Sequence, residues 1–115
     1  MRDQRKFMRH TLNSTVSVFN NHNHEYLGIV VDISEQGLMV SSAMPLECDK
    51  KYILQIVDAP VNGGGRHSGS ISARAVWSAK INSTMYGTGF EIESRSEQAS
   101  AMFKRYVEEG ISSRS

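Results

Sequence analysis

The feature that most constrains the fold is a succession of six short segments in which apolar residues alternate with polar ones. This period of two is typical of β-strands, whose successive side chains point to opposite faces of a sheet. Turn-forming residues separate the segments and no helical period intervenes, so neighbouring strands are expected to pair antiparallel. The expected strands cover residues 15–19, 26–33, 38–40, 51–57, 70–79 and 85–92. The sequence therefore predicts an all-β fold whose six-stranded antiparallel sheet curls or closes.

Two of these strands carry more specific expectations. In the second strand, the apolar run 29–31 followed by Ile33 indicates burial on parts of both faces. In the fifth strand, every second residue from Ile71 to Trp77 is expected on one face, and Val76 is expected on the other. The side chain of Trp77 is thereby predicted to share a face with small and branched apolar residues.

The end of the chain changes to a helical period. Ser94 and Glu97 have the spacing of a capping box, which predicts that a helix begins there. Gly110 is expected to end it. The apolar residues that recur at helical spacing are Ala99, Met102, Phe103, Tyr106 and Val107. We expect one amphipathic C-terminal helix, which covers an open end or face of the sheet.

The longest expected connection, residues 58–70, contains Pro60 and the glycine triplet 63–65. Proline and glycine interrupt regular structure, so the whole segment is predicted to be a loop. The triplet is not a phosphate-binding loop, because it lacks the Gly-Lys-Ser/Thr ending and is flanked by strands on both sides.

Length and charge limit the classes of function. A chain of 115 residues has room for one domain, and a formal net charge of +1 argues against a bulk electrostatic DNA binder. No apolar run is long enough to span a membrane, and no apolar stretch follows the charged N-terminus as a secretory signal would require. The single cysteine, Cys48, cannot form an internal disulfide, which favours a soluble protein of a reducing cytoplasm.

The charge is unevenly distributed along the chain. Residues 1–10 carry four basic side chains and one acidic side chain, a net +3, so the rest of the chain carries −2. We expect residues 1–10 to be a flexible basic arm and residues 11–111 to be the folded domain. A solvated tail and a ligand-binding arm are both compatible with this distribution.

Residue patterns for catalysis or metal binding are weak. His22 and His24 lie close together, but no further pair of candidate ligands is near them, so a polar turn is favoured over a metal site. Cys48 has no CxxC spacing or partnered histidine that would activate it as a nucleophile. No set of nucleophile, base and orienting residue is evident, and the sequence predicts a protein that is not an enzyme.

Two short motifs have the chemistry of a ligand site. The first is Arg5-x-x-x-Arg9, whose planar guanidinium groups can bind guanine or phosphate in bidentate fashion. The second is Asp32-x-Ser34-x-x-Gly37, at an expected strand-to-strand turn. The Asp32 carboxylate can accept hydrogen bonds from guanine, and Ser34 is expected on the same face. Gly37 allows a backbone conformation that other residues resist and leaves room for close approach. A simple turn, capped by the aspartate and serine side chains, is the alternative interpretation.

The order of these motifs resembles that of the PilZ domain family. The resemblance includes Arg5-x-x-x-Arg9 and, after an intervening strand, Asp32-x-Ser34-x-x-Gly37. It extends to residues 73–77 (ARAVW) and 87–91 (GTGFE), which are similar to the closing strand pair of that family. The match covers nearly the whole chain, and it implies a six-stranded antiparallel β-barrel with a C-terminal α-helix.

The same resemblance implies a function. PilZ domains bind the bacterial second messenger cyclic di-GMP, and the family's roles for Arg5 and Arg9 are to hold guanine and phosphate from a flexible arm that orders over the ligand. Asp32 and Ser34 would contact the other side of the ligand, and Gly37 would permit the turn. Cyclic di-GMP is the implied ligand, and no other cofactor is expected.

Three questions stay open at this stage. Trp77 is either an aromatic contact of the guanine or a tryptophan of the barrel core or rim. Many PilZ proteins carry a further arginine or an apolar residue directly before the first arginine of the motif, whereas here Gln4 precedes Arg5 and Lys6 follows it. The residue before the motif bears on whether one ligand or an intercalated pair is bound. A ligand-binding adaptor would relay the signal to an unidentified protein partner. A PilZ-fold protein-interaction or structural adaptor that does not depend on nucleotide is the alternative.

Binding of DNA or RNA and insertion into a membrane are not expected. A small barrel that binds single-stranded nucleic acid would need aromatic residues interleaved with lysine or arginine on adjacent strands, and Phe19, Tyr26, Tyr52, Trp77 and Phe90 are not so placed.

Overall fold

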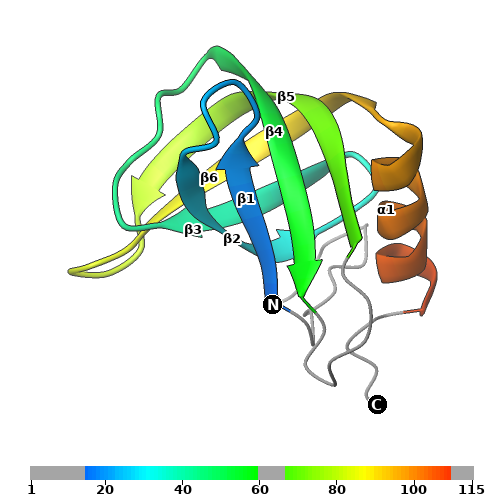
Figure 1. The fold of residues 1–115 in the computed structure, drawn as a ribbon. Helices are drawn as coiled ribbons and strands as arrows, with labels where there is room; N and C mark the ends of the chain where they lie inside the picture. The colour runs from blue at the N-terminus through cyan, green and yellow to red at the C-terminus, as the bar shows by residue number, and fades with distance from the viewer. Residues whose placement is uncertain (1–14, 60–66, 110–115) are drawn as a thin grey trace.

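A computed structural model describes residues 15–59 and 67–109. In these residues the chain forms six strands followed by one helix (Figure 1). The elements are β1 (Thr15–Asn20), β2 (Tyr26–Ile33), β3 (Gly37–Ser42), β4 (Lys50–Ala59), β5 (His67–Lys80), β6 (Tyr86–Arg95) and α1 (Glu97–Glu109).

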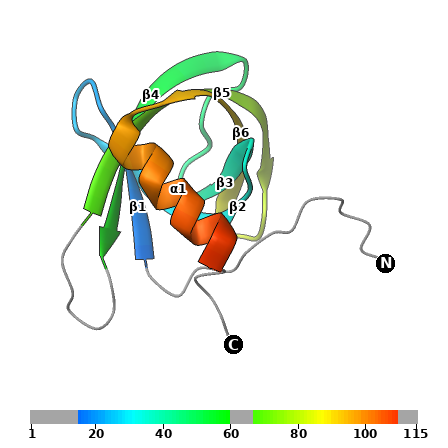
Figure 2. The ribbon, with the colours of Figure 1, turned by 90° about the vertical axis from the view of Figure 1, so that its right-hand side faces the viewer.

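The six strands close into an antiparallel barrel in the order β1-β2-β3-β6-β5-β4 (Figure 2). Strand β1 pairs with β2 on one side and with β4 on the other, so each of the described strands is paired on both sides. Closure satisfies the backbone groups that a sheet edge would leave exposed to other chains. The predicted six-stranded antiparallel sheet, its closure into a barrel and the C-terminal helix are confirmed.

The core fills the barrel and extends to the helix. Tyr52 and Phe90 pack edge to face inside it, with their ring centroids 5.6 Å apart. The most deeply buried apolar side chains of the barrel are Val16, Val18, Ile33, Val40, Leu54, Ile56, Ile71, Ala73 and Ala75. They alternate with outward-facing residues along their strands, as the period of two requires.

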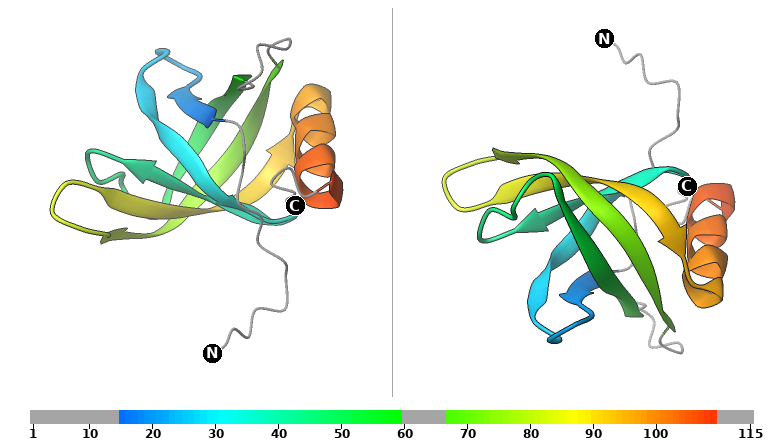
Figure 3. Two further views of the ribbon diagram at one scale, coloured as in Figure 1. Left: turned by 90° about the horizontal axis from the view of Figure 1, so that it is seen from below. Right: turned by 90° about the horizontal axis from the view of Figure 1, so that it is seen from above.

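Helix α1 lies across one end of the barrel, against β5 and β6 (Figure 2). Its buried face consists of Ala99, Met102, Phe103 and Tyr106, which confirms the predicted apolar face for these four residues. Val107, the fifth residue of that predicted face, is only half-buried. The turn between β5 and β6 projects at the opposite end of the barrel (Figure 3). The helix thus closes only one end of the barrel.

The predicted start of the helix is wrong by two residues. Ser94 remains in β6, where it pairs with Ser72, because the ladder with β5 continues to Arg95. Ser96 is the cap instead: its hydroxyl oxygen accepts a hydrogen bond from the Ala99 amide at 3.1 Å. The same oxygen accepts from the Ser70 amide at 3.0 Å, so the cap also joins α1 to β5. Gly110, the expected end of the helix, lies outside the described residues.

The loop predicted over residues 58–70 is too long. Asp58 pairs with His67 between β4 and β5, and Asp58 also pairs with Val16 of β1. Pairing on both sides of β4 keeps the strand regular beyond the point at which turn residues would end it locally. The rest of the predicted loop, residues 60–66, lies outside the described residues.

A buried polar contact joins β4 to the helix. The Tyr106 hydroxyl donates to Oδ2 of Asp58 at 2.6 Å, and both side chains are almost completely buried. Arg105 places Nη2 3.6 Å from the same oxygen. Burial, reinforced by the hydrogen bond to Asp58, raises the pKa of Tyr106 far above its usual value near 10. Among the described residues, the other oxygen of Asp58, Oδ1, is buried without a hydrogen-bond partner.

Candidate functional site

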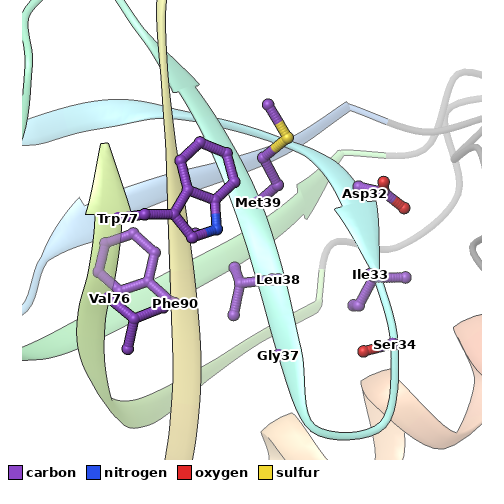
Figure 4. A pocket seen from close by; sticks show the side chains of 10 residues that line it. Asp32, Ile33, Ser34, Gly37, Leu38, Met39, Val76, Trp77 and Phe90 are labelled. Atoms are coloured by element: carbon purple, nitrogen blue, oxygen red, sulfur yellow. The ribbon is translucent and has the colours of Figure 1, made fainter. Parts of the chain in front are cut away.

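A pocket of about 170 Å³ lies where the end of β2 and the start of β3 approach β5 and β6. Its lining residues come from four strands and the β2–β3 turn: Asp32, Ile33, Ser34, Gly37, Leu38, Met39, Val76, Trp77, Gly89 and Phe90. Figure 4 shows Asp32 and Ser34 on one side of β3 and Val76 and Trp77 on the other.

Four residues singled out from the sequence meet in this pocket. Asp32, Ser34 and Gly37 come from the second motif, and Trp77 comes from a strand that is distant in the chain. The barrel brings them together because β3 and β5 both pair with β6. The two arginines of the first motif, Arg5 and Arg9, lie outside the described residues.

The β2–β3 turn that carries the second motif is short and tightly packed. The Ser34 amide donates to the Gly37 carbonyl at 3.0 Å, and the Ile92 amide of β6 donates to the Gln36 carbonyl at 2.9 Å. A Cβ atom on Gly37 would lie 2.5 Å from the carbonyl oxygen of Phe90, so a side chain would displace β6.

The two expectations for Gly37 have different outcomes. The expected close approach of another backbone is confirmed by the Phe90 carbonyl. The expected special conformation is wrong, because Gly37 is not among the described residues with a positive φ. Space, rather than backbone freedom, therefore requires glycine at this position.

A bulge in β2 determines where Asp32 points. Val30 pairs with Val40 and Asp32 pairs with Met39, so Val31 is an extra residue on β2. Val30 and Ile33 are therefore both buried, whereas Val31 is 39% exposed, and the predicted burial on both faces is wrong at Val31. The bulge places Asp32 on the outside, where it lines the same pocket as Ser34.

A second bulge corrects the predicted face of Trp77. Ala75 pairs with Phe90 and Trp77 pairs with Gly89, so Val76 is an extra residue on β5. The alternation is shifted by one residue, and Trp77 leaves the face it was expected to share with Ile71. Its side chain is 44% exposed on the outside of the barrel, which excludes the barrel-core interpretation.

Three outward-facing pocket residues were missed by the sequence analysis: Met39, Val76 and Gly89. Met39 and Val76 look like ordinary alternating strand residues, and nothing local distinguishes them. Gly89 is different, because glycine inside a strand indicates close approach by another group. The spacing of Gly87 and Gly89 on one face of β6 was the available signal.

The far side of the β2–β3 turn faces a separate groove of about 420 Å³ next to α1. Arg95 spans this groove: Nη1 donates to the Glu35 carbonyl at 3.2 Å, and the guanidinium lies 5.1 Å from the Phe103 ring centroid. This contact connects the turn directly to the C-terminal helix.

The other candidate groups from the sequence, His22, His24 and Cys48, do not line the pocket. Within residues 15–59 and 67–109, no group of three or more His, Cys, Asp or Glu side chains is placed to hold a metal ion. His22 and His24 lie in the exposed β1–β2 turn, and Cys48 is exposed. In the described part of the chain, no helix has both the length and the apolar character needed to cross a membrane.

Comparison with known proteins adds three findings. The model of the family described as PilZ domain matches residues 3–109. The PilZ domain with c-di-GMP of YcgR from Escherichia coli superposes with a TM-score of 0.64 at 14% identity, covering 93% of this chain and 91% of that one. Comparison with curated protein sequences gives no match.

The inhibitor of motility MotI/DgrA of Bacillus subtilis has the same fold. It superposes with a TM-score of 0.63 at 12% identity and covers 94% of this chain. The chain spans only about half of MotI, 51% of its length.

Proposed function

The chain belongs to the PilZ domain family, and on that premise we propose that it binds cyclic di-GMP and relays the signal to a protein partner without catalysing a reaction. The observation that carries this proposal is the pocket itself, in which the Asp32, Ser34 and Gly37 motif meets an exposed tryptophan.

Each polar group of the pocket has a role that suits a guanine nucleotide. The Asp32 carboxylate accepts hydrogen bonds from the N1–H and the exocyclic amine of a guanine base. The Ser34 hydroxyl both donates and accepts, and so suits the ribose or a phosphate oxygen. Because Gly37 has no side chain, β3 can pass close to β6 beneath them.

The arginines of the N-terminal arm complete the proposed site. Arg5 and Arg9 supply the positive charge and the bidentate donors that two phosphodiester groups require. Residues 1–10 carry a net +3 against −2 on the rest of the chain, so a dianionic ligand is attracted by the arm. The arm would then close over the pocket from the side that Asp32 and Ser34 do not cover.

The similarity to YcgR supports the identity of the ligand. That PilZ domain was solved with c-di-GMP, and nearly all of it corresponds to this chain. MotI, described as an inhibitor of motility, shares the fold, and a regulatory output of this kind is compatible with the proposed relay.

Calorimetric titration of the whole chain with cyclic di-GMP tests the proposal. Wild type is expected to bind, and the measured stoichiometry decides between one ligand and an intercalated pair. Arg5→Ala, Arg9→Ala and Asp32→Ala are each expected to weaken binding by roughly tenfold to a hundredfold, about 1–3 kcal/mol. Their melting temperatures should stay close to that of wild type, because Asp32 is only half-buried and its substitution leaves the core intact.

Lys104→Ala is the matched control, since Lys104 is an exposed cation on α1 outside the pocket. It is expected to bind as wild type does. Absence of binding to wild type would reject the proposed function and favour the nucleotide-independent adaptor. Equal losses for Lys104→Ala and the arginine variants would indicate attraction by net charge alone.

A further inference from the structure

The pocket contains a single row of outward-facing residues that crosses four strands. Trp77 of β5 pairs with Gly89 of β6, and Gly89 pairs in turn with Met39 of β3. Met39 pairs with Asp32 of β2. The row therefore has the aromatic side chain of Trp77 at one end and the carboxylate of Asp32 at the other, with Met39 between them (Figure 4). Gly89 is the strand partner next to Trp77.

Gly89 provides the space in which the indole lies. The three atoms nearest to a Cβ built on Gly89 are Nε1, Cε2 and Cδ1 of Trp77, all of the five-membered ring and all closer than a real side chain tolerates. The indole thus occupies the volume that a side chain at position 89 would fill. Gly89 is itself buried, although it faces outward, and Trp77 keeps 44% of its surface exposed.

Gly87, two residues earlier on the same face of β6, is in a different environment. A Cβ there would lie 2.5 Å from Cε of Met39 and 3.0 Å from Cδ1 of Ile81. These atoms are the ends of flexible side chains, which can move aside by rotation about a bond. Of the two glycines, only Gly89 is covered by the indole.

We infer that Gly89 is a positioning residue, which holds the Trp77 indole against β6 so that its exposed side forms a stacking surface for a planar base. The inference rests on the proposed function, and it assigns the base to the space between the indole and Asp32. Stacking uses the face of the base, whereas Asp32 reads its edge, so the two contacts act on one ring without competing.

The chain offers a direct readout, because Trp77 is its only tryptophan. Gly89→Ala forces the indole away from β6, and we expect the emission of the free protein to shift to longer wavelength as the ring enters water. The fold should survive, because an exposed ring can swing outward. Gly87→Ala adds the same methyl group two residues away and is expected to leave the emission unchanged.

Binding of cyclic di-GMP to four proteins completes the test: wild type, Gly89→Ala, Trp77→Ala and the double variant. Gly89→Ala and Trp77→Ala are each expected to bind about tenfold more weakly than wild type, the lower end of what base stacking contributes. The double variant should bind no more weakly than Trp77→Ala, because Gly89 acts only through the indole.

Three results would overturn the inference. Gly89→Ala that binds and fluoresces like wild type would mean that Gly89 does not hold the indole in place. Losses that add in the double variant would mean that the new methyl group obstructs the ligand itself. Wild type that does not bind cyclic di-GMP would reject the proposed function and this inference with it, whereas in the first two cases the proposed function stands.

Discussion

Two aspartates near strand ends, Asp32 on β2 and Asp58 on β4, have opposite environments. Asp58 is 2% exposed and accepts a hydrogen bond from Tyr106 where α1 covers the barrel. Asp32 is half-buried and lines the pocket on the outer face of the barrel. One end of the barrel is thus closed by buried groups under α1, whereas the pocket lies on the outer face, where Trp77 is 44% exposed.

The difference shows how burial determines what a carboxylate does. A buried carboxylate needs donors from its own chain, because desolvation without them is costly, and so Asp58 links β4 to α1. Asp32 is only half-buried, so its substitution is expected to cost less stability than substitution of the buried Asp58. The comparison predicts that substitutions under α1 change stability, whereas polar substitutions in the pocket change binding.

Tyr106→Ala should have the largest effect on stability. It removes a fully buried ring from the core and the hydroxyl that donates to Asp58. We expect the free energy of unfolding to fall by about 3–5 kcal/mol, as for other buried aromatic residues truncated to alanine. Urea unfolding measures it, and a loss under about 1 kcal/mol would contradict the structural role of this end of the barrel.

Gly37→Ala should reduce the free energy of unfolding by less than Tyr106→Ala does. Gly37 is the exception among the pocket residues, because its substitution is expected to change stability. The new Cβ would lie 2.5 Å from the Phe90 carbonyl, and backbone cannot move aside as a side chain does. We expect a loss of about 1–3 kcal/mol, typical of overpacking. Gly87→Ala, which meets only flexible side-chain ends, is the control and should lose less. Equal losses of stability for both variants would contradict the expectation that a clash with backbone costs more than a clash with flexible side chains.

Raising the pH above about 10 should have the smallest effect on the free energy of unfolding. The folded protein keeps the Tyr106 proton well above pH 10, whereas the unfolded chain loses it near pH 10. This contribution to stability is therefore complete below about pH 10 and falls by up to about 1.4 kcal/mol per pH unit above it. Tyr106→Phe lacks this contribution, so its urea midpoint should decline less steeply between about pH 9 and 11. Parallel curves would contradict a buried, hydrogen-bonded hydroxyl.

Much of the fold could be predicted from local patterns. All six strands and the buried face of α1 follow from periods that are visible within a few residues. The Asp32-x-Ser34-x-x-Gly37 spacing placed three pocket residues on one turn, because a short turn holds its residues close together. The helix cap was misplaced, since Ser94 has the capping-box spacing to Glu97 and only its pairing with β5 keeps it in the strand, which leaves Ser96 as the cap.

By itself, the sequence determined the strands, the helix face and the family, because side-chain period and motif spacing are properties of neighbouring residues. The tertiary structure alone decided which residues face the pocket. The bulges at Val31 and Val76 shift the alternation by one residue, and they are defined only by how β2 and β5 pair with their neighbouring strands. Pairing of β5, β6, β3 and β2 also placed Trp77 over Gly89 and Asp32 at the other end of the same row, a proximity that no local pattern encodes because four strands must pair to create it.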